Sequence, residues 1–244
     1  MSAVSGLKAS DGAEDYGREW NPYVTVRGGW LFGTAEFEEW MKAANDTSSD
    51  WQIRDIKNAW SGSVEFGQSY DDRVFVGLEI GYFTGKTKNF MGRSYIAGAL
   101  GRVDMTWKAN GKIGNYFGAC NITLRQDVGA RGFLYGGIGA GIARSKLSVD
   151  VDKTVTVTIP PAPAVVVNVP LKMSKSKWRF LGQAFAGFGV YLNENWQLTV
   201  GYRLRYLPGS FQEGINNDAI GLKYGSSVKQ DIIHAAEVGL AYQF

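Results

Sequence analysis

The most restrictive feature of the sequence is a two-residue alternation over residues 231–244, which read DIIHAAEVGLAYQF. From Ile232 onward every second residue is apolar or aromatic, apart from one histidine, and this set ends in Tyr242 and Phe244. The residues between them are mostly small or polar and include Glu237. Because alternate side chains of a β-strand point to opposite faces, the segment is predicted to form a strand with one apolar face and one face that carries a carboxylate.

Seven earlier segments show the same alternation, and most have the roughly 9 to 11 residues that a tilted strand needs to cross a bilayer. Together with the last segment they predict eight strands, at residues 23–32, 60–68, 74–83, 105–124, 133–143, 178–192, 196–206 and 232–244. The connections are long after the first, third, fifth and seventh strands and short after the others. Transmembrane β-barrels have this asymmetry, with short periplasmic turns and long extracellular loops.

Aromatic residues fall near both ends of these strands, as expected for the two interfaces of a membrane. The predicted extracellular rim contains Trp30, Trp60, Tyr82, Trp107, Trp178 and Tyr206. The predicted periplasmic rim contains Tyr23, Tyr70, Tyr135, Tyr191, Trp196, Tyr242 and Phe244. Two aromatic belts favour a membrane barrel over a soluble sandwich.

Two motifs give the chain a family resemblance. The segment FLYGGIGAGIA resembles the Tyr-x-Gly-x-Gly-x-Gly strand of the OmpA-type and opacity-type outer-membrane barrels, here with Tyr135 followed by glycines at 137, 139 and 141. Phe244, two residues after Tyr242, resembles the terminal Phe that the barrel-assembly machinery reads in this family. The resemblance implies an eight-stranded antiparallel up-and-down transmembrane β-barrel in the bacterial outer membrane. It also implies that Tyr242 and Phe244 form the assembly signal.

The domain organisation is predicted to be simple. Residues 21–244 should form the single barrel domain, and the polar, unpatterned residues 1–20 should form a disordered periplasmic segment. This start lacks the apolar region of a secretory signal, so we expect the signal of an exported precursor to have been removed. The longest uncharged stretch, residues 154–171, contains four prolines, each of which costs about 3 kcal/mol in a helix interior. It is therefore excluded as a membrane helix.

Two additions to the barrel are expected on the extracellular side. Residues 34–45 carry Phe37, Trp40, Met41 and Ala44 at helical spacing, which predicts a short amphipathic helix. Two β-prone runs within residues 148–176 flank a proline-rich turn and predict a hairpin that prolongs the fifth and sixth strands beyond the membrane. The remaining stretches at 84–102 and 207–230 are predicted to be loops.

The inward-facing positions collect three acids and three bases: Arg27, Glu65, Glu79, Arg203, Arg205 and Glu237. Because an unpaired buried charge is costly, we expect this set to form ion pairs. An eight-stranded barrel is only wide enough for side chains to fill, so the set predicts a salt-bridged plug. The alternative is a narrow, gated pore lined by the same residues.

Several function classes are excluded or disfavoured by composition. The chain has one Cys, Cys120, and one His, His234, so neither an internal disulfide nor a metal site built on these residue types can form. The net charge of +3 is spread over both signs without a basic block, which gives no support to nucleic-acid binding. His234 is predicted to face outward and lacks the His-x-Ser arrangement of lipid A deacylase barrels. We therefore expect no catalytic residues and no cofactor.

The expected function is that of a surface or structural outer-membrane protein with an adhesive or envelope-stabilising role. Its expected partners are outer-membrane lipid and lipopolysaccharide, the barrel-assembly machinery, and an extracellular ligand bound through the loops. The main alternative is a passive channel for small or apolar solutes. A soluble lipocalin-type barrel comes third, because its interior should be apolar, whereas the charges here lie on the face opposite the apolar side chains.

Overall fold

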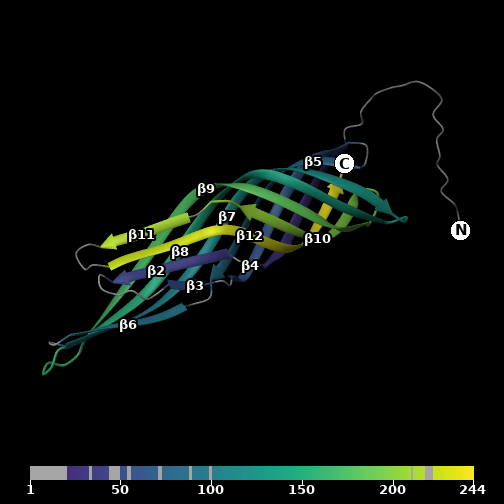
Figure 1. Ribbon diagram of the computed structural model, residues 1–244. Helices are drawn as coiled ribbons and strands as arrows, with labels where there is room; N and C mark the ends of the chain where they lie inside the picture. The colour runs from purple at the N-terminus through teal and green to yellow at the C-terminus, as the bar shows by residue number, and fades with distance from the viewer. Residues whose placement is uncertain are drawn as a thin grey trace, which may run out of the picture.

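The computed structural model describes residues 21–32, 35–43, 50–53, 56–70, 73–87, 90–98, 101–209, 211–217 and 222–244. Eight antiparallel strands follow one another around a barrel, and the first closes on the last (Figure 1). These are β1 (Asn21–Phe32), β4 (Ile56–Tyr70), β5 (Val74–Thr87), β7 (Gly101–Val128), β8 (Gly132–Thr158), β9 (Val165–Tyr191), β10 (Trp196–Leu207) and β12 (Leu222–Gln243). The prediction of an eight-stranded up-and-down barrel is confirmed. The predicted segment at 1–20 lies outside the described residues.

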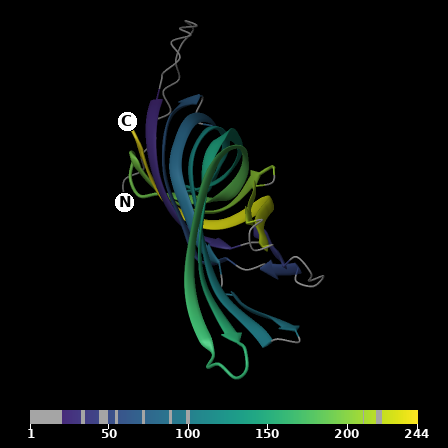
Figure 2. The same cartoon turned by 90° about the vertical axis from the view of Figure 1, so that its left-hand side faces the viewer.

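The two ends of the barrel differ. At the short-turn end, three or four residues separate β4 from β5, β7 from β8 and β9 from β10, and the C-terminus lies at this end. At the opposite, extended end, β7, β8 and β9 have 28, 27 and 27 residues and project well beyond the barrel (Figure 2). The predicted hairpin at 148–176 is therefore confirmed as a continuation of β8 and β9.

Four further strands lie at the extended end: β2 (Ala35–Ala43), β3 (Asp50–Ile53), β6 (Phe90–Gly98) and β11 (Phe211–Asn217). The predicted helix at 34–45 is wrong, because β2 pairs with β12 and with β3. β12 begins at Leu222, well before its predicted start, and the backbone hydrogen bonds that it offers outweigh the local helical spacing. The predicted loops are likewise partly strand, since β6 pairs with β7 and β11 with β12.

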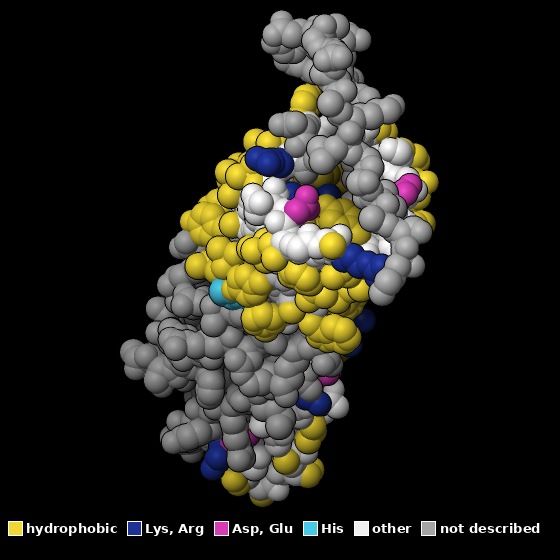
Figure 3. Space-filling view, turned by 90° about the vertical axis from the view of Figure 1, so that its right-hand side faces the viewer, with side chains coloured by type: hydrophobic (Ala, Val, Ile, Leu, Met, Phe, Trp, Pro, Cys, Tyr) yellow, Lys and Arg dark blue, Asp and Glu magenta, His cyan; other side chains and the backbone are white. Residues whose placement is uncertain are grey.

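The outer surface of the barrel is apolar. Leu78 and Ile80 on β5 are each 62% exposed and Ile138 on β8 is 66% exposed, and hydrophobic side chains form a broad band on the described part of the face in Figure 3. An exposed apolar surface of this extent marks contact with lipid rather than water. No helix long and apolar enough to cross a membrane occurs in the described part of the chain.

The aromatic belts are present but smaller than predicted. Trp60, Tyr82 and Tyr116 contact one another in series at the extended end of the outer surface, and Trp196, Tyr242 and Phe244 do so at the short-turn end, mostly edge to face. Three residues predicted for the second belt lie instead on the inner face: Tyr23, Tyr135 and Tyr191. Their inward positions follow from the two-residue alternation of a strand, since each is an even number of residues from inward-facing neighbours. The side chain of Trp107 lies outside the described ones.

Candidate functional site in the barrel lumen

The barrel lumen brings together all six charged side chains that the alternation assigns to the inner face. Strand register sets their heights: Glu65 on β4 lies directly opposite Glu79 on β5, and Glu237 on β12 faces glycines of β1 and β10. Two acids side by side repel each other unless cations lie between them. The arrangement therefore requires the arginines that project from β1 and β10.

Arg27 neutralises the paired acids from β1. Its Nη1 lies 2.9 Å from Glu65 Oε2 and 3.8 Å from Glu79 Oε1. Tyr23, four residues earlier on the same face of β1, donates its hydroxyl to Glu65 Oε1 at 2.6 Å. Both oxygens of the Glu65 carboxylate are thus occupied.

Arg203 joins the two halves of the network. Its Nη1 lies 2.8 Å from Glu79 Oε2 and its Nε lies 2.8 Å from Glu237 Oε2. Arg205 then binds the other oxygen of Glu237 through Nη2, also at 2.8 Å. A continuous series of ion pairs therefore crosses the lumen from Arg27 to Arg205, with Arg203 as its central member.

Two amide side chains complete this charged layer. Asn121 on β7 donates through Nδ2 to Glu65 Oε2 at 2.6 Å and to Glu79 Oε2 at 2.9 Å. Gln183 on β9 donates to Glu79 Oε2 at 2.8 Å and to Asn121 Oδ1 at 2.6 Å. These residues extend the network to the opposite wall, so that polar side chains of β1, β4, β5, β7, β9, β10 and β12 meet at one level.

An apolar layer covers the charged one on the side of the extended end. It consists of Phe83, Phe117, Ala119, Ala143, Leu181, Leu207 and Ile233, all buried. Arg205 lies beneath it, with its guanidinium carbon 5.1 Å from the ring centroid of Phe117 and 5.6 Å from that of Phe83. Within the described residues, Nε and Nη1 of Arg205 have no hydrogen-bond partner. The aromatic rings therefore supply much of the environment of this cation.

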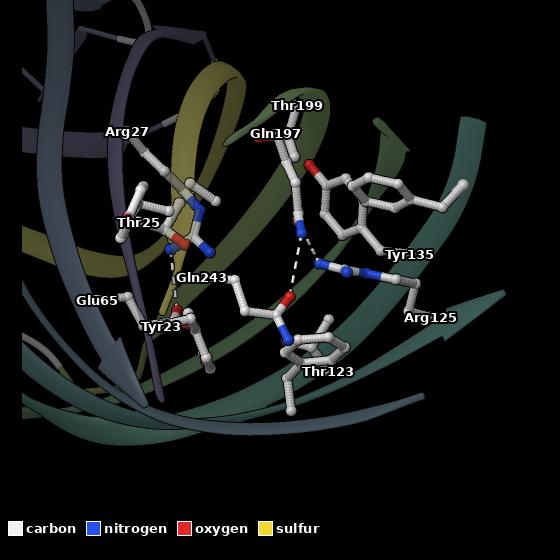
Figure 4. Close-up of a pocket in the computed structure, with 14 residues that line it drawn as sticks. Tyr23, Thr25, Arg27, Glu65, Thr123, Arg125, Tyr135, Gln197, Thr199 and Gln243 are labelled. Atoms are coloured by element: carbon white, nitrogen blue, oxygen red, sulfur yellow. Dashed lines mark hydrogen bonds and ion pairs between the residues drawn. The ribbon is translucent and has the colours of Figure 1, made fainter. Parts of the chain in front are cut away.

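A third layer closes the lumen towards the short-turn end. The guanidinium of Arg125, on β7, lies between the rings of Phe75 and Phe133, 4.1 and 4.2 Å from their centroids. Its Nη2 donates to Gln197 Oε1 at 2.7 Å, and Gln197 in turn donates to Gln243 at 3.2 Å (Figure 4). This layer spans the barrel from β5 to β12.

A cavity of about 40 Å³ lies between the charged layer and the Arg125 layer. Its lining includes Thr25, Arg27 and Glu65 on one side and Arg125, Tyr135 and Gln197 on the other (Figure 4). One buried water needs roughly 10 to 15 Å³ of this kind of volume, so the cavity has room for a few waters and its polar walls suit them.

Glycines on the inner faces make room for these layers. A Cβ added at Gly77 would lie 2.5 Å from Tyr23 Oη and 2.9 Å from Glu65 Oε1. A Cβ added at Gly139 would lie 2.0 Å from Asn121 Oδ1. The glycine-rich strand is thus explained by the side chains that it faces, which fill the lumen in place of its own.

Sequence reasoning missed the uncharged members of the network and Arg125. Asn121 and Arg125 lie an even number of residues apart on the inward face of β7. The same two-residue alternation that assigns the charged residues to the lumen therefore identifies both. Residues 125–131 were instead expected to be a connection, whereas β7 continues to Val128. Nothing in the sequence distinguishes Gln183 as a member of the network, because an inward-facing amide side chain is common in a barrel.

The remaining residues named in the sequence analysis lie on the outer surface of the barrel: Tyr242, Phe244, Cys120 and His234. Tyr242 packs edge-on against Trp196 and Phe244, with centroids 4.9 Å apart in both pairs. Cys120 is exposed and free. His234 contacts the Tyr202 hydroxyl through Nδ1 and stacks on Phe32. Among the described residues, no cluster of His, Cys, Asp and Glu could hold a metal ion.

Comparison with known proteins finds similar structures but no similar sequences. No family model and no curated protein matches the chain. The outer membrane protein AlkL, solved in lipid bilayers, is 14% identical with a TM-score of 0.46, covering 100% of this chain and 97% of that one. OprG from Pseudomonas aeruginosa is 12% identical with a TM-score of 0.39, covering 92% and 96%.

The outer membrane protease OmpT from Escherichia coli is also similar, at 8% identity and a TM-score of 0.34, covering 92% of this chain and 97% of that one. At such identities and TM-scores, these similarities assign no activity or ligand to the chain. The barrel architecture rests on its own closed strand order and register.

Proposed function

We propose that this chain is a bacterial outer-membrane barrel with a closed lumen and a structural or surface role, either adhesive or envelope-stabilising. The observation that carries the proposal is the filled lumen. Three stacked layers, apolar, ion-paired and Arg125-centred, cross the barrel, and the charged layer draws side chains from seven of its eight strands. Opening a path would require breaking several buried ion pairs together, which is costly because each separation leaves a desolvated charge.

The apolar exterior supports placement in a membrane, and the unequal ends support an orientation. In this orientation the short-turn end lies in the periplasm and the extended end lies outside the cell. The barrel surface would contact outer-membrane lipid and lipopolysaccharide. Tyr242 and Phe244, which remain accessible on the outer surface at the short-turn end, would be read by the barrel-assembly machinery during insertion.

The extended end supports a surface role. The hairpin of β8 and β9 projects beyond the barrel, and near its tip Ile159, Val165 and Val166 are each more than half exposed. Exposed apolar side chains on a projecting hairpin offer an adhesive surface for an extracellular ligand. We propose no catalytic role, since the lumen charges are engaged with one another and His234 lies on the lipid-facing surface.

Osmotic swelling of liposomes tests the closed lumen. Liposomes containing the refolded protein, placed in isotonic glycine or arabinose, are expected to swell no faster than protein-free liposomes. A passive pore for small solutes, the second candidate, is suggested by the cavity near the short-turn end. It predicts swelling that accelerates with the amount of protein and with decreasing solute size, and that result would overturn the closed lumen.

Complementation of cells that lack the gene distinguishes the adhesive role from the envelope-stabilising role. The full chain is compared with a variant in which residues 150–171 are replaced by a short turn. An envelope-stabilising role predicts that both chains restore resistance to detergent. An adhesive role predicts that only the full chain restores attachment, whereas detergent resistance is unaffected by the gene. Attachment that is independent of the hairpin would exclude the adhesive role proposed for it.

A further inference from the structure

The outer surface changes character along one row of paired residues on four adjacent strands. β5, β7, β8 and β9 present mainly apolar side chains outward as far as one row, which contains Tyr82, Tyr116 and Trp178. Arg144 lies in the same row, because it pairs in register with Tyr116 on one side and with Trp178 on the other. This row marks the point at which the lipid-facing surface ends.

The next two rows beyond it contain lysine, serine, threonine and glycine, and no apolar side chain. The nearer row consists of Thr84, Gly114, Lys146 and Ser176. The farther row consists of Lys86, Lys112, Ser148 and Ser174. We refer to the exposed cations of these three rows as the basic band, which consists of Lys86, Lys112, Arg144 and Lys146.

The basic band has no acidic counterpart in its own rows. Its three rows, all within the described part of the chain, contain no Asp or Glu on the outward face. Acids appear only farther out, where Asp150 pairs in register with Lys172 and Asp152 with Lys108. The distal rows therefore balance their own charge, whereas the basic band has four positive charges and, among the described residues of its rows, no acid.

A hollow of about 400 Å³ lies on this surface, lined by Tyr116, Arg144, Lys146, Ser174, Lys175 and Ser176. Arg144 donates through Nη2 to Ser176 Oγ at 3.5 Å, which directs the guanidinium towards the serine hydroxyls. Guanidinium, ammonium and hydroxyl groups together are suited to phosphate oxygens. The hollow thus has both the chemistry and the space for a phosphate group.

We propose that the basic band and its hollow bind the phosphate groups of outer-leaflet lipids. Its place directly beyond the aromatic row puts the cations at headgroup level, while the acyl chains of the same lipid lie along the apolar strands below. A lipid therefore contacts both the cations, through its phosphate, and the apolar strands, through its acyl chains. Free phosphate contacts the cations alone. This inference deepens the proposed function and rests on its membrane placement, but it is independent of the closed lumen.

Native mass spectrometry of the refolded protein in detergent tests the proposal. The probes are phosphatidic acid and phosphatidylcholine with identical acyl chains. The double variant Lys112→Gln/Lys146→Gln should bind phosphatidic acid about twenty-fivefold more weakly than the natural chain, at about fivefold per cation. The matched control Lys108→Gln/Lys172→Gln removes the same charge from the balanced rows and should change binding less than twofold. Phosphatidylcholine binding should be equal in all three.

Three results would overturn the proposal. They are equal losses in both double variants, no loss in either, or displacement of phosphatidic acid by inorganic phosphate at comparable concentration. Folding is checked by the heat-dependent gel mobility of each variant. If a double variant does not fold, the single replacements of Lys112 and Lys146 should each weaken binding about fivefold. Because swelling and conductance report on the lumen, a failure here is distinct from a failure of the closed barrel.

Discussion

Replacing Arg203 by Met is the sharpest perturbation of the lumen. Arg203 contacts both Glu79 and Glu237 at 2.8 Å, and its guanidinium lies 4.5 Å from the ring centroid of Phe185. Methionine fills most of the volume but leaves the two carboxylates without their shared cation. Glu79 then keeps its amide donors and Arg27 at 3.8 Å, and Glu237 keeps Arg205 as its one ion-pair partner among the described residues.

The expected loss in the free energy of unfolding is about 3 kcal/mol, at the low end of the roughly 3 to 5 kcal/mol for breaking a buried pair, because both acids retain a partner. Arg205→Met is the matched control. Arg205 makes one ion pair, with Glu237, and two of its guanidinium nitrogens are unpartnered within the described residues. Its loss should cost only about 1 to 2 kcal/mol, since removing unsatisfied buried donors offsets part of the effect.

Equilibrium urea unfolding in lipid vesicles, followed by tryptophan fluorescence, measures both values. A double-mutant cycle of Arg203→Met with Glu79→Gln should give a coupling energy of about 1 to 3 kcal/mol. The reasoning is refuted if Arg205→Met destabilises the barrel as much as Arg203→Met, or if the coupling energy is near zero. Either result would mean that the ion pairs are not what holds the lumen side chains together.

Three further predictions follow from the lumen and the rim. Gly77→Ala should lower the free energy of unfolding by about 1 to 3 kcal/mol, because the added Cβ clashes with Tyr23. Gly28→Ala is the control: nothing lies within 4 Å of its added Cβ, so the free energy of unfolding should be nearly unchanged in the same urea assay. Arg125→Ala should cost about 1 to 2 kcal/mol by removing the cation–π contacts with Phe75, Phe133 and Tyr191, yet planar-bilayer recordings should show no conductance because two layers remain. Phe244→Ser should slow the appearance of heat-modifiable protein in cells, while the purified variant still refolds to the heat-modifiable barrel, because Phe244 is 69% exposed and lies outside the three lumen layers.

The barrel itself could be predicted because lipid and lumen impose opposite demands on alternate residues. That alternation identified the eight strands and assigned charged residues such as Arg27 and Arg203 to the inner face. It failed at residues 34–45, where β2 depends on a partner almost two hundred residues away in the chain. A local pattern contains no information about such a partner, so the helical spacing of Phe37 and Trp40 was misleading.

The composition of the lumen was harder to predict than its location. Parity shows which way a side chain points, but not which side chains from other strands it meets. The contacts of Asn121 with Glu65 and Glu79 depend on the register of three strands and on the stagger that closes the barrel. The inward position of Tyr23 was overlooked because its aromatic ring also fitted a membrane belt.

The most direct test of the closed lumen is the conductance of the refolded natural chain in a planar lipid bilayer. The three-layer plug predicts silence, or rare and irregular openings, over the usual range of voltages. Steady conductance whose ion selectivity changes in Arg203→Met or Glu237→Gln would contradict it. The charged layer would then line a path for ions instead of closing one.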